Sequence, residues 1–115
     1  MTAIRGAIDV VQNTEEEISR RTCQLYRELC LRNDLQERLV SALIISLTDD
    51  IDCKNPATCL RENGFLSETP LFCVQEARIK GQLPRIIRFL LLTEQKVEKR
   101  HDVYLGKAAS LRPDL

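Results

Sequence analysis

The chain has 115 residues, with 17 basic and 17 acidic side chains, so its formal net charge is zero. This balance argues against a nucleic-acid-binding protein, which normally gathers an excess of basic residues on one face. A hydrophobic content of 43% and a charged content of 30% are typical of a globular protein, and the length predicts a single domain over residues 1–115. A domain this small would complete a large ligand site with surface from a second copy.

The cysteines and the N-terminus give a prediction of the compartment. None of the cysteines has a C-x-x-C spacing and there is one histidine, His101, so we expect neither a metal site nor a disulfide framework but reduced thiols. The N-terminus, MTAIRGAIDVV, lacks the apolar core of a signal peptide, and no segment reaches the ~20 apolar residues of a membrane helix. These features predict a cytoplasmic protein without a membrane partner. The cysteines are Cys23, Cys30, Cys53, Cys59 and Cys73.

The first third of the chain predicts a strand and then a helix. Residues 3–11 alternate, with Ile4 and Ile8 on one face and Arg5 on the other, as in a half-buried strand. Residues 14–32 follow as an amphipathic helix, which opens with the capping box of Thr14 and Glu17. Its apolar stripe faces the core, and its polar face, predicted to meet water, carries Arg20, Arg21, Gln24 and Arg27.

The middle of the chain predicts a buried strand and a short helix. Residues 39–47, LVSALIISL, are apolar on both alternating sets, as in a central strand that is covered on both sides. A polar turn then leads to NPATCLRENG, where Asn55 suits the N-cap, Pro56 the first helical position and Gly64 the position after the helix.

The last third predicts three strands, over 71–79, over 84–93 and in the short stretch VYLG (103–106). Pro113 excludes a long final helix. The order β-α-β-α-β-β-β describes an α+β domain with a mixed sheet. Every predicted strand is apolar on both faces or nearly so, and two helices cannot cover both sides of such a sheet. We therefore expect packing between sheets in a homo-oligomer, which would place ligand sites between subunits.

One residue conflicts with this pattern. Residues 84–93, PRIIRFLLLT, form the most hydrophobic segment of the chain, yet Arg88 lies at its centre. Either a protein carboxylate neutralises this cation, or an anionic ligand binds it, because an unpaired buried charge costs several kcal/mol.

Seven stretches spread over nearly the whole chain carry a family resemblance. They are IRGA (4–7), TEEEI (14–18), PATCLRE (56–62), CVQE (73–76), RIIR (85–88), VYLGKA (103–108) and LRPDL (111–115). In this order and spacing they resemble the monofunctional chorismate mutases of the trimeric α/β pseudo-barrel class. The resemblance implies a homotrimer without cofactor or metal, with active sites between subunits. It also implies the rearrangement of chorismate to prephenate on the route to phenylalanine and tyrosine.

The resemblance also implies a set of site residues. Arg88 would reach the breaking ether bond, Glu76 would accept a hydrogen bond from the ring hydroxyl, and Tyr104 and Arg5 would bind substrate carboxylates. Cys73 would lie beside Glu76, although strand alternation places the two on opposite faces unless a bulge intervenes or Glu76 lies beyond the strand. The remaining substrate-binding residues that it implies are Arg61, Phe72, Thr58, Leu111 and Arg112.

Two positions depart from the family pattern. Thr58 stands where the relatives compared carry a lysine, and Asn55 stands where they carry an apolar aromatic residue. The entrance to the site therefore loses one cation and one hydrophobic wall, while the inner arginines are unaffected.

Three other interpretations stay open. The first is a trimeric small-molecule-binding or imine-hydrolysing protein of similar fold. The second is a structural or partner-binding module, in which a protein carboxylate neutralises Arg88 and no cationic cleft is open. The third is a hydrolase that pairs Cys73 with His101, for which nothing supplies an orienting group or an oxyanion hole.

Overall fold

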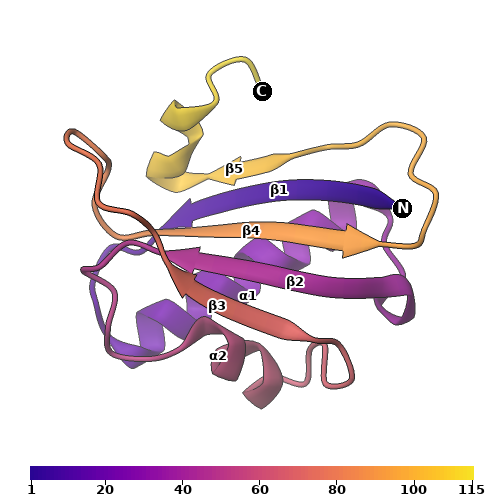
Figure 1. Cartoon of the computed structure of the whole chain (residues 1–115), viewed down its shortest axis with the longest axis horizontal. Coiled ribbons are helices and arrows are strands. Elements are labelled where there is room, and N and C mark those ends of the chain that lie inside the picture. Colours follow the sequence, from indigo (N-terminus) through magenta and orange to yellow (C-terminus); the bar gives the residue numbers. More distant parts are fainter.

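The computed structural model describes residues 1–115 and contains one five-stranded mixed sheet in the order β3-β2-β4-β1-β5 (Figure 1). The central strand β4 runs antiparallel to both β1 and β2, while β3 is parallel to β2 and β5 is parallel to β1. The α+β class with a mixed sheet is therefore confirmed. The strands are β1 (Thr2–Asp9), β2 (Val40–Leu47), β3 (Leu71–Gln75), β4 (Ile86–Thr93) and β5 (Val103–Leu105).

Both predicted helices are present. In α1 (Glu15–Asn33) the hydroxyl of Thr14 accepts a hydrogen bond from the backbone N–H of Glu17 at 3.2 Å, as the capping box predicted. In α2 (Pro56–Glu62) the side chain of Asn55 accepts one from the N–H of Ala57 at 2.8 Å. Two 3₁₀ turns, η1 (Glu37–Leu39) and η2 (Gly106–Leu111), were not predicted. Neither α1 nor α2 combines the length and hydrophobicity that crossing a bilayer requires.

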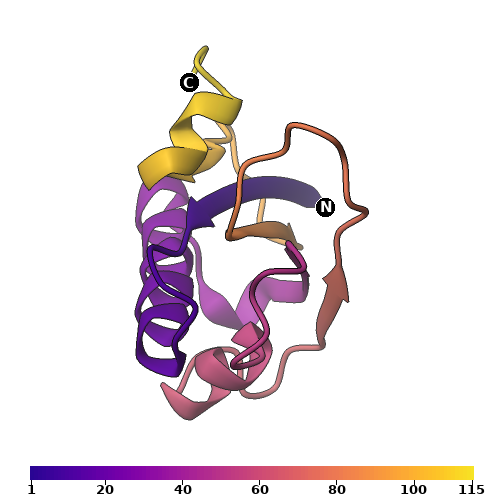
Figure 2. The ribbon, with the colours of Figure 1, turned by 90° about the vertical axis from the view of Figure 1, so that its left-hand side faces the viewer.

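The main core lies between one face of the sheet and the two helices (Figure 2). Ile8 of β1, Ile45 of β2 and Leu25 of α1 are all 0% exposed within it. Gly6 lets α1 approach β1 closely, because a Cβ at this position would lie 3.0 Å from Leu29 Cδ1. This contact fixes the height of the helix above the strand that carries Arg5.

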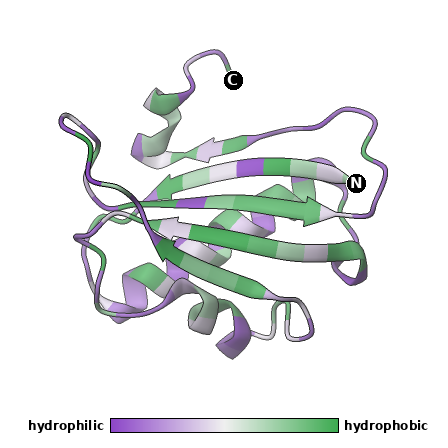
Figure 3. Ribbon diagram, in the orientation of Figure 1, coloured by the Kyte–Doolittle hydropathy of each residue, from purple (hydrophilic) through white to green (hydrophobic).

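The opposite face of the sheet is open over β2 and β3 and covered at one end. Ile44, Phe72 and Val74 on this face are 37%, 66% and 37% exposed. Figure 3 shows strands that are mostly hydrophobic, with short hydrophilic interruptions in β1 and β4. At the covered end, Ala7 and Ile86 pack under Ala108 of η2 in a second buried cluster. The prediction that the second face lacks cover within the chain is thus correct for β2 and β3 and wrong for this end.

Three local predictions need correction. The third strand ends at Gln75 rather than at residue 79. The fourth begins at Ile86, because Pro84 has no N–H to donate and Arg85 adopts φ 50°. Arg21, predicted to face water, has a side chain that is only 12% exposed, and its Nη2 lies 2.7 Å from Asp9 Oδ1.

Candidate active site

A cavity of about 310 Å³ opens on the uncovered face of the sheet, over β2, β4, β1 and β5. It forms where the side chains of these four strands point away from the helices, so residues far apart in the sequence become neighbours. Arg88 of β4 stands opposite Ala7 of β1 and Ser46 of β2 in the strand register. The lining residues are Arg5, Gly6, Ile44, Ser46, Arg88, Phe89, Leu90 and Tyr104.

Arg88 lies on the open face, and this resolves the conflict that its position in the sequence raised. Its neighbours Ile87 and Phe89 point to the helix-covered core, whereas the side chain of Arg88 is 41% exposed. Its Nε lies 2.7 Å from Glu76 Oε1. A protein carboxylate therefore pairs with the cation, as the partner-binding interpretation predicted, but the cleft that this interpretation excluded is open. The ion pair engages Nε and leaves the two terminal nitrogens without an ion-pair partner in the chain.

Glu76 is held by three contacts just beyond the end of β3. Its backbone N–H donates to the carbonyl of Leu47 at 2.7 Å, which extends the pairing with β2 by one residue. Its Oε1 accepts a hydrogen bond from the hydroxyl of Ser46 at 2.7 Å and also receives Arg88. Both partners contact the same oxygen, so Oε2 remains available as an acceptor. Glu76 lies one residue beyond the strand, yet it keeps the alternation and reaches Arg88 on the open face, so neither explanation places it beside Cys73, which lies on the opposite face.

Arg5 of β1 is joined to Asp102, the residue that precedes β5. The guanidinium Nη2 donates to Asp102 Oδ2 at 3.1 Å, and the backbone N–H of Arg5 donates to Asp102 Oδ1 at 2.9 Å. The side chain of Arg5 is 48% exposed, whereas that of Asp102 is 4% exposed. A buried carboxylate therefore holds an arginine that lines the cavity and is itself half exposed.

The C-terminal segment brings three further predicted residues together. Tyr104 of β5 pairs in register with Ala7, and the guanidinium carbon of Arg112 lies 5.9 Å from the centre of its ring. Leu111 packs on the buried cluster around Ala7. Two hydrogen bonds join Arg112 to Asp114, at 3.0 and 2.8 Å, and they lower the pKa of the Asp114 carboxyl and raise that of Arg112. Leu111 and Arg112 thus lie beside the cavity rim that Tyr104 forms.

The remaining predicted residues do not reach this cavity within one chain. Cys73 pairs in register with Ile45 and packs on the helix-covered core, on the face opposite to Arg88. Thr58 and Arg61 are exposed on α2, which lies behind the sheet. Phe72 is on the open face, opposite Ile44, but does not line the cavity.

The pairing of Cys73 with His101 is wrong. Cys73 lies on β3, whereas His101 precedes β5, and these strands form opposite edges of the sheet. Burial also raises the pKa of the Cys73 thiol, so it stays protonated at neutral pH.

Two residues of the site escaped the sequence prediction, Ser46 and Asp102. Ser46 carried a faint signal, because it is one of only two hydroxyl side chains in the apolar run 39–47. Asp102 carried none, since it ends the charged stretch EQKVEKRHD and only the pairing of β5 with β1 brings it to Arg5.

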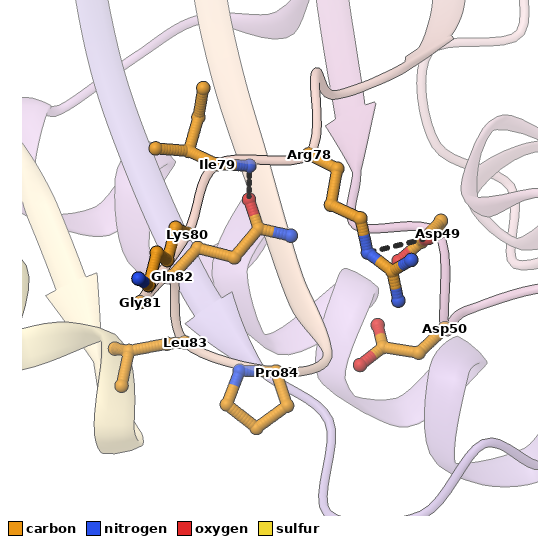
Figure 4. Close-up of a pocket in the computed structure, with 9 residues that line it drawn as sticks. All are labelled: Asp49, Asp50, Arg78, Ile79, Lys80, Gly81, Gln82, Leu83 and Pro84. Carbon is orange, nitrogen blue, oxygen red and sulfur yellow. Dashed lines mark hydrogen bonds and ion pairs between the residues drawn. The ribbon is translucent and has the colours of Figure 1, made fainter.

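A second hollow of about 460 Å³ lies under the loop between β3 and β4 (Figure 4). Although larger, it is polar, and its groups bind one another: Arg78 lies 3.4 Å from Asp49, and the N–H of Ile79 donates to Gln82 at 3.1 Å. Asp50 is engaged by the backbone N–H of Arg85 at 3.0 Å. We therefore assign the site to the smaller cavity, which gathers Arg5, Arg88 and Tyr104.

The chemistry available in this cavity is anion binding. Two arginines and a tyrosine hydroxyl can hold carboxylate or ether oxygens. Glu76 does not itself line the cavity, but it pairs with Arg88 and offers one free acceptor oxygen for a hydroxyl. No group of three or more His, Cys, Asp or Glu side chains is arranged to bind a metal ion.

Comparisons with known proteins show the family of the chain. The family model described as chorismate mutase type I matches residues 1–115. The chain is 36% identical over 115 residues to the chorismate mutase AroH of Bacillus subtilis, covering 97% of this chain and 90% of that protein. It is also 36% identical over 115 residues to the AroH of Thermus thermophilus, covering 97% and 93%. Among solved structures, a chorismate mutase from Clostridium thermocellum matches with a TM-score of 0.90 and 33% identity, covering 96% of this chain and 99% of that one. The chain belongs to the type I chorismate mutase family.

Proposed function

We propose that this protein is a chorismate mutase, which converts chorismate to prephenate in the biosynthesis of phenylalanine and tyrosine. The observation that carries the proposal is the open cleft lined by Arg88, which pairs with Glu76 through Nε and whose terminal nitrogens have no ion-pair partner in the chain. An arginine held in this way is a preorganised donor for an anionic substrate.

The reaction explains why the cleft needs arginines and no nucleophile. Within one molecule an ether C–O bond breaks while a C–C bond forms, so no atom is exchanged with the protein and no proton is transferred. Catalysis then consists of holding the enolpyruvyl side chain over the ring and stabilising the negative charge that grows on the ether oxygen.

Each residue of the cleft has a proposed role in this chemistry. A terminal nitrogen of Arg88 donates to the ether oxygen, and Oε2 of Glu76 accepts from the ring hydroxyl. Arg5 and the hydroxyl of Tyr104 bind carboxylates of the substrate. Cys73 stays a proposed contact without a reactive role, and its position behind the sheet gives it no direct support.

The balance of charges supports a site that is completed by a second subunit. Glu76 offsets the charge of Arg88, and Asp102 is shared between Arg5 and Arg100, so one chain offers a dianion only part of the positive charge that would balance it. Arg61 is exposed on α2 and has no ion-pair partner in the chain. In the proposed homotrimer, Arg61 and Thr58 of a neighbouring subunit close over the cleft, while Phe72, Leu111 and Arg112 line the entrance.

The uncovered part of the sheet supports the same assembly. Ile44, Phe72 and Val74 form an apolar surface over β2 and β3 that packing against another subunit would remove from water. The proposed catalytic unit is the domain of residues 1–115, without cofactor or metal. The proposed compartment is the cytoplasm, where the five free cysteines would stay reduced.

The decisive experiment measures chorismate loss and prephenate formation by the purified protein and by Arg88→Ala. Catalysis by the wild type with a loss of at least ~10³-fold in the variant would support both the function and the role of Arg88. A wild type that leaves chorismate unchanged, yet gains thermal stability from a dicarboxylate such as malate, would favour the small-molecule-binding alternative.

A mixing experiment tests the proposed division of the site between subunits. Arg88→Ala and Arg61→Ala are each expected to be impaired. When the two are unfolded together and refolded as a mixture, roughly a quarter of the sites should combine an intact Arg88 with an intact Arg61 from the neighbouring subunit. Recovered activity supports a shared site, whereas a mixture no more active than its components contradicts it.

A further inference from the structure

We infer that Asp102 is a positioning residue for substrate binding, acting through Arg5. This inference rests on the proposed function, since it assumes that Arg5 binds a carboxylate of the substrate. Asp102 does not line the cavity. It binds Arg5, which does line the cavity, and so restricts the position of the guanidinium.

The contacts of Asp102 are unusual for a carboxylate at the edge of a site. Oδ1 accepts the backbone N–H of Arg5 at 2.9 Å, Oδ2 accepts Arg5 Nη2 at 3.1 Å, and Arg100 Nε lies 3.4 Å from Oδ1. One carboxylate thus binds the main chain and the side chain of the same residue. This double contact restricts both the backbone position of Arg5 and the position of its guanidinium group.

Asp102 is itself held in place by α1. The side-chain amide of Asn33 donates to the carbonyl of His101 at 2.9 Å, and its oxygen accepts the N–H of His101 at 2.7 Å. The same amide nitrogen donates to Leu29 within the helix at 2.9 Å. Asn33 is 6% exposed, so a buried side-chain amide binds both the N–H and the carbonyl of His101. These two contacts fix the backbone next to Asp102.

These contacts have a direct consequence for binding. An arginine side chain that moves freely must be ordered when a ligand binds, and this ordering weakens binding. With Nη2 fixed on Asp102, Arg5 is ordered in advance and its remaining N–H groups are available to a carboxylate. Partners that orient the ligands of metal sites typically contribute tenfold or more to metal affinity, and we expect an effect of about this size for Asp102.

The test is a double-mutant cycle with Asp102→Asn and Arg5→Ala, measured on the full-length protein. Asparagine keeps an oxygen for the N–H of Arg5 but replaces Oδ2 with an amide that cannot accept from Nη2. We expect Asp102→Asn to raise KM by about tenfold and to change kcat by less than about twofold, because uniform binding is lost rather than stabilisation specific to the transition state. In the Arg5→Ala background, adding Asp102→Asn should leave KM at the value of Arg5→Ala alone. Glu28→Gln is the matched control, since Glu28 pairs with Arg32 at 3.0 Å on the surface of α1.

Two results would overturn the inference. One is a KM for folded Asp102→Asn equal to that of the wild type. The other is the same rise in KM with and without Arg5, which would mean that Asp102 acts only on the fold. If Asp102→Asn does not fold, as judged by circular dichroism, Asp102→Glu replaces it, with the same expectations, because it keeps the charge but displaces both oxygens by one methylene group.

The binding of malate, measured by calorimetry on the same four proteins, keeps this test separate from the proposed function. If the wild type does not convert chorismate, the proposed function fails, and the malate cycle still tests the coupling. An unchanged dissociation constant for malate in Asp102→Asn would then overturn the inference. A rise of about tenfold that disappears in the Arg5→Ala background would support it.

Discussion

Replacing Arg88 with lysine keeps the positive charge and changes only its geometry, so it tests the proposed mechanism at one atom. In the wild type, Nε pairs with Glu76 Oε1 at 2.7 Å and the terminal nitrogens remain for the ligand. A lysine has a single nitrogen, which lies one bond beyond the position of Nε and within reach of Glu76. We expect this ammonium to pair with Glu76 and to leave the ether oxygen without a donor.

The expected magnitude follows from two losses. The lost charge-assisted hydrogen bond to the ether oxygen contributes about 2 kcal/mol. The cation also lies farther from the ether oxygen by about one or two bond lengths, which removes about 1 kcal/mol of electrostatic stabilisation at an effective dielectric constant near 20. A loss of about 3 kcal/mol of transition-state stabilisation corresponds to a decrease in kcat of roughly two orders of magnitude. KM should change much less, because the ether oxygen acquires its charge only in the transition state.

The assay follows the loss of chorismate absorbance over a range of substrate concentrations, so that kcat and KM are obtained separately. Arg20→Lys is the matched control, because Arg20 also pairs with a glutamate, Glu17, but on the solvent-exposed face of α1. A kcat for Arg88→Lys within about threefold of both the wild type and this control would refute the reasoning, since charge alone would then suffice.

Further predictions concern stability and pH. Asp9→Ala removes the nearer of the two carboxylates beside the buried cation of Arg21 and leaves Glu17, at 3.9 Å. It should reduce the free energy of unfolding by about 3 kcal/mol and Tm by roughly 10 °C, measured at fixed protein concentration. Gly106→Ala should destabilise more than Gly81→Ala in the same melts: both glycines have positive φ, but a Cβ at Gly106 would lie 2.1 Å from Asp9 Oδ1, whereas one at Gly81 meets nothing within 4 Å. Equal losses of stability in the two variants would show that the positive φ alone, and not the contact with Asp9, determines the destabilisation. Burial and the hydrogen bond to Glu37 raise the pKa of Tyr26, so above the ordinary value of about 10 the unfolded chain releases a proton that the folded chain keeps, and stability should fall as pH rises. Tyr26→Phe should show a shallower fall in urea unfolding between roughly pH 9 and 11. Turnover, in contrast, should be flat around neutral pH because no proton moves in the reaction, and a bell-shaped profile of kcat would indicate acid–base catalysis.

Periodicity and capping residues predicted most of the elements. The five strands and two helices lie where alternation, the capping box at Thr14 and the N-cap at Asn55 indicated. Errors came from side chains whose partners are distant in the sequence. Arg21 has the helical position of a surface residue, and only the fold brings Asp9 to it.

The same limit applies to the site. The sequence singled out Arg88 as a cation in an apolar strand but did not indicate which carboxylate would pair with it. The alternation of apolar residues predicts the face of the sheet on which a side chain lies, but not which side chains contact it. The contact with Glu76 depends on the parallel pairing of β3 with β2 and on Ser46, which lies between the two side chains in the sheet. Neither the pairing nor the register could be derived from composition or spacing. Asp102 was missed for the same reason.

The parallel pairing of β1 with β5, which joins Gly6 to Val103, has a consequence for synthesis of the chain. While a ribosome still holds the C-terminal residues, β1 is an unpaired edge strand and Arg5 lacks its carboxylate partner. Nascent sheets with an open edge are prone to pair with other chains, and pairings between distant residues form slowly. The half of this cleft that contains Arg5 therefore assembles only after Asp102 and β5 have left the ribosome, and a nascent chain that stalls before Asp102 has no completed site.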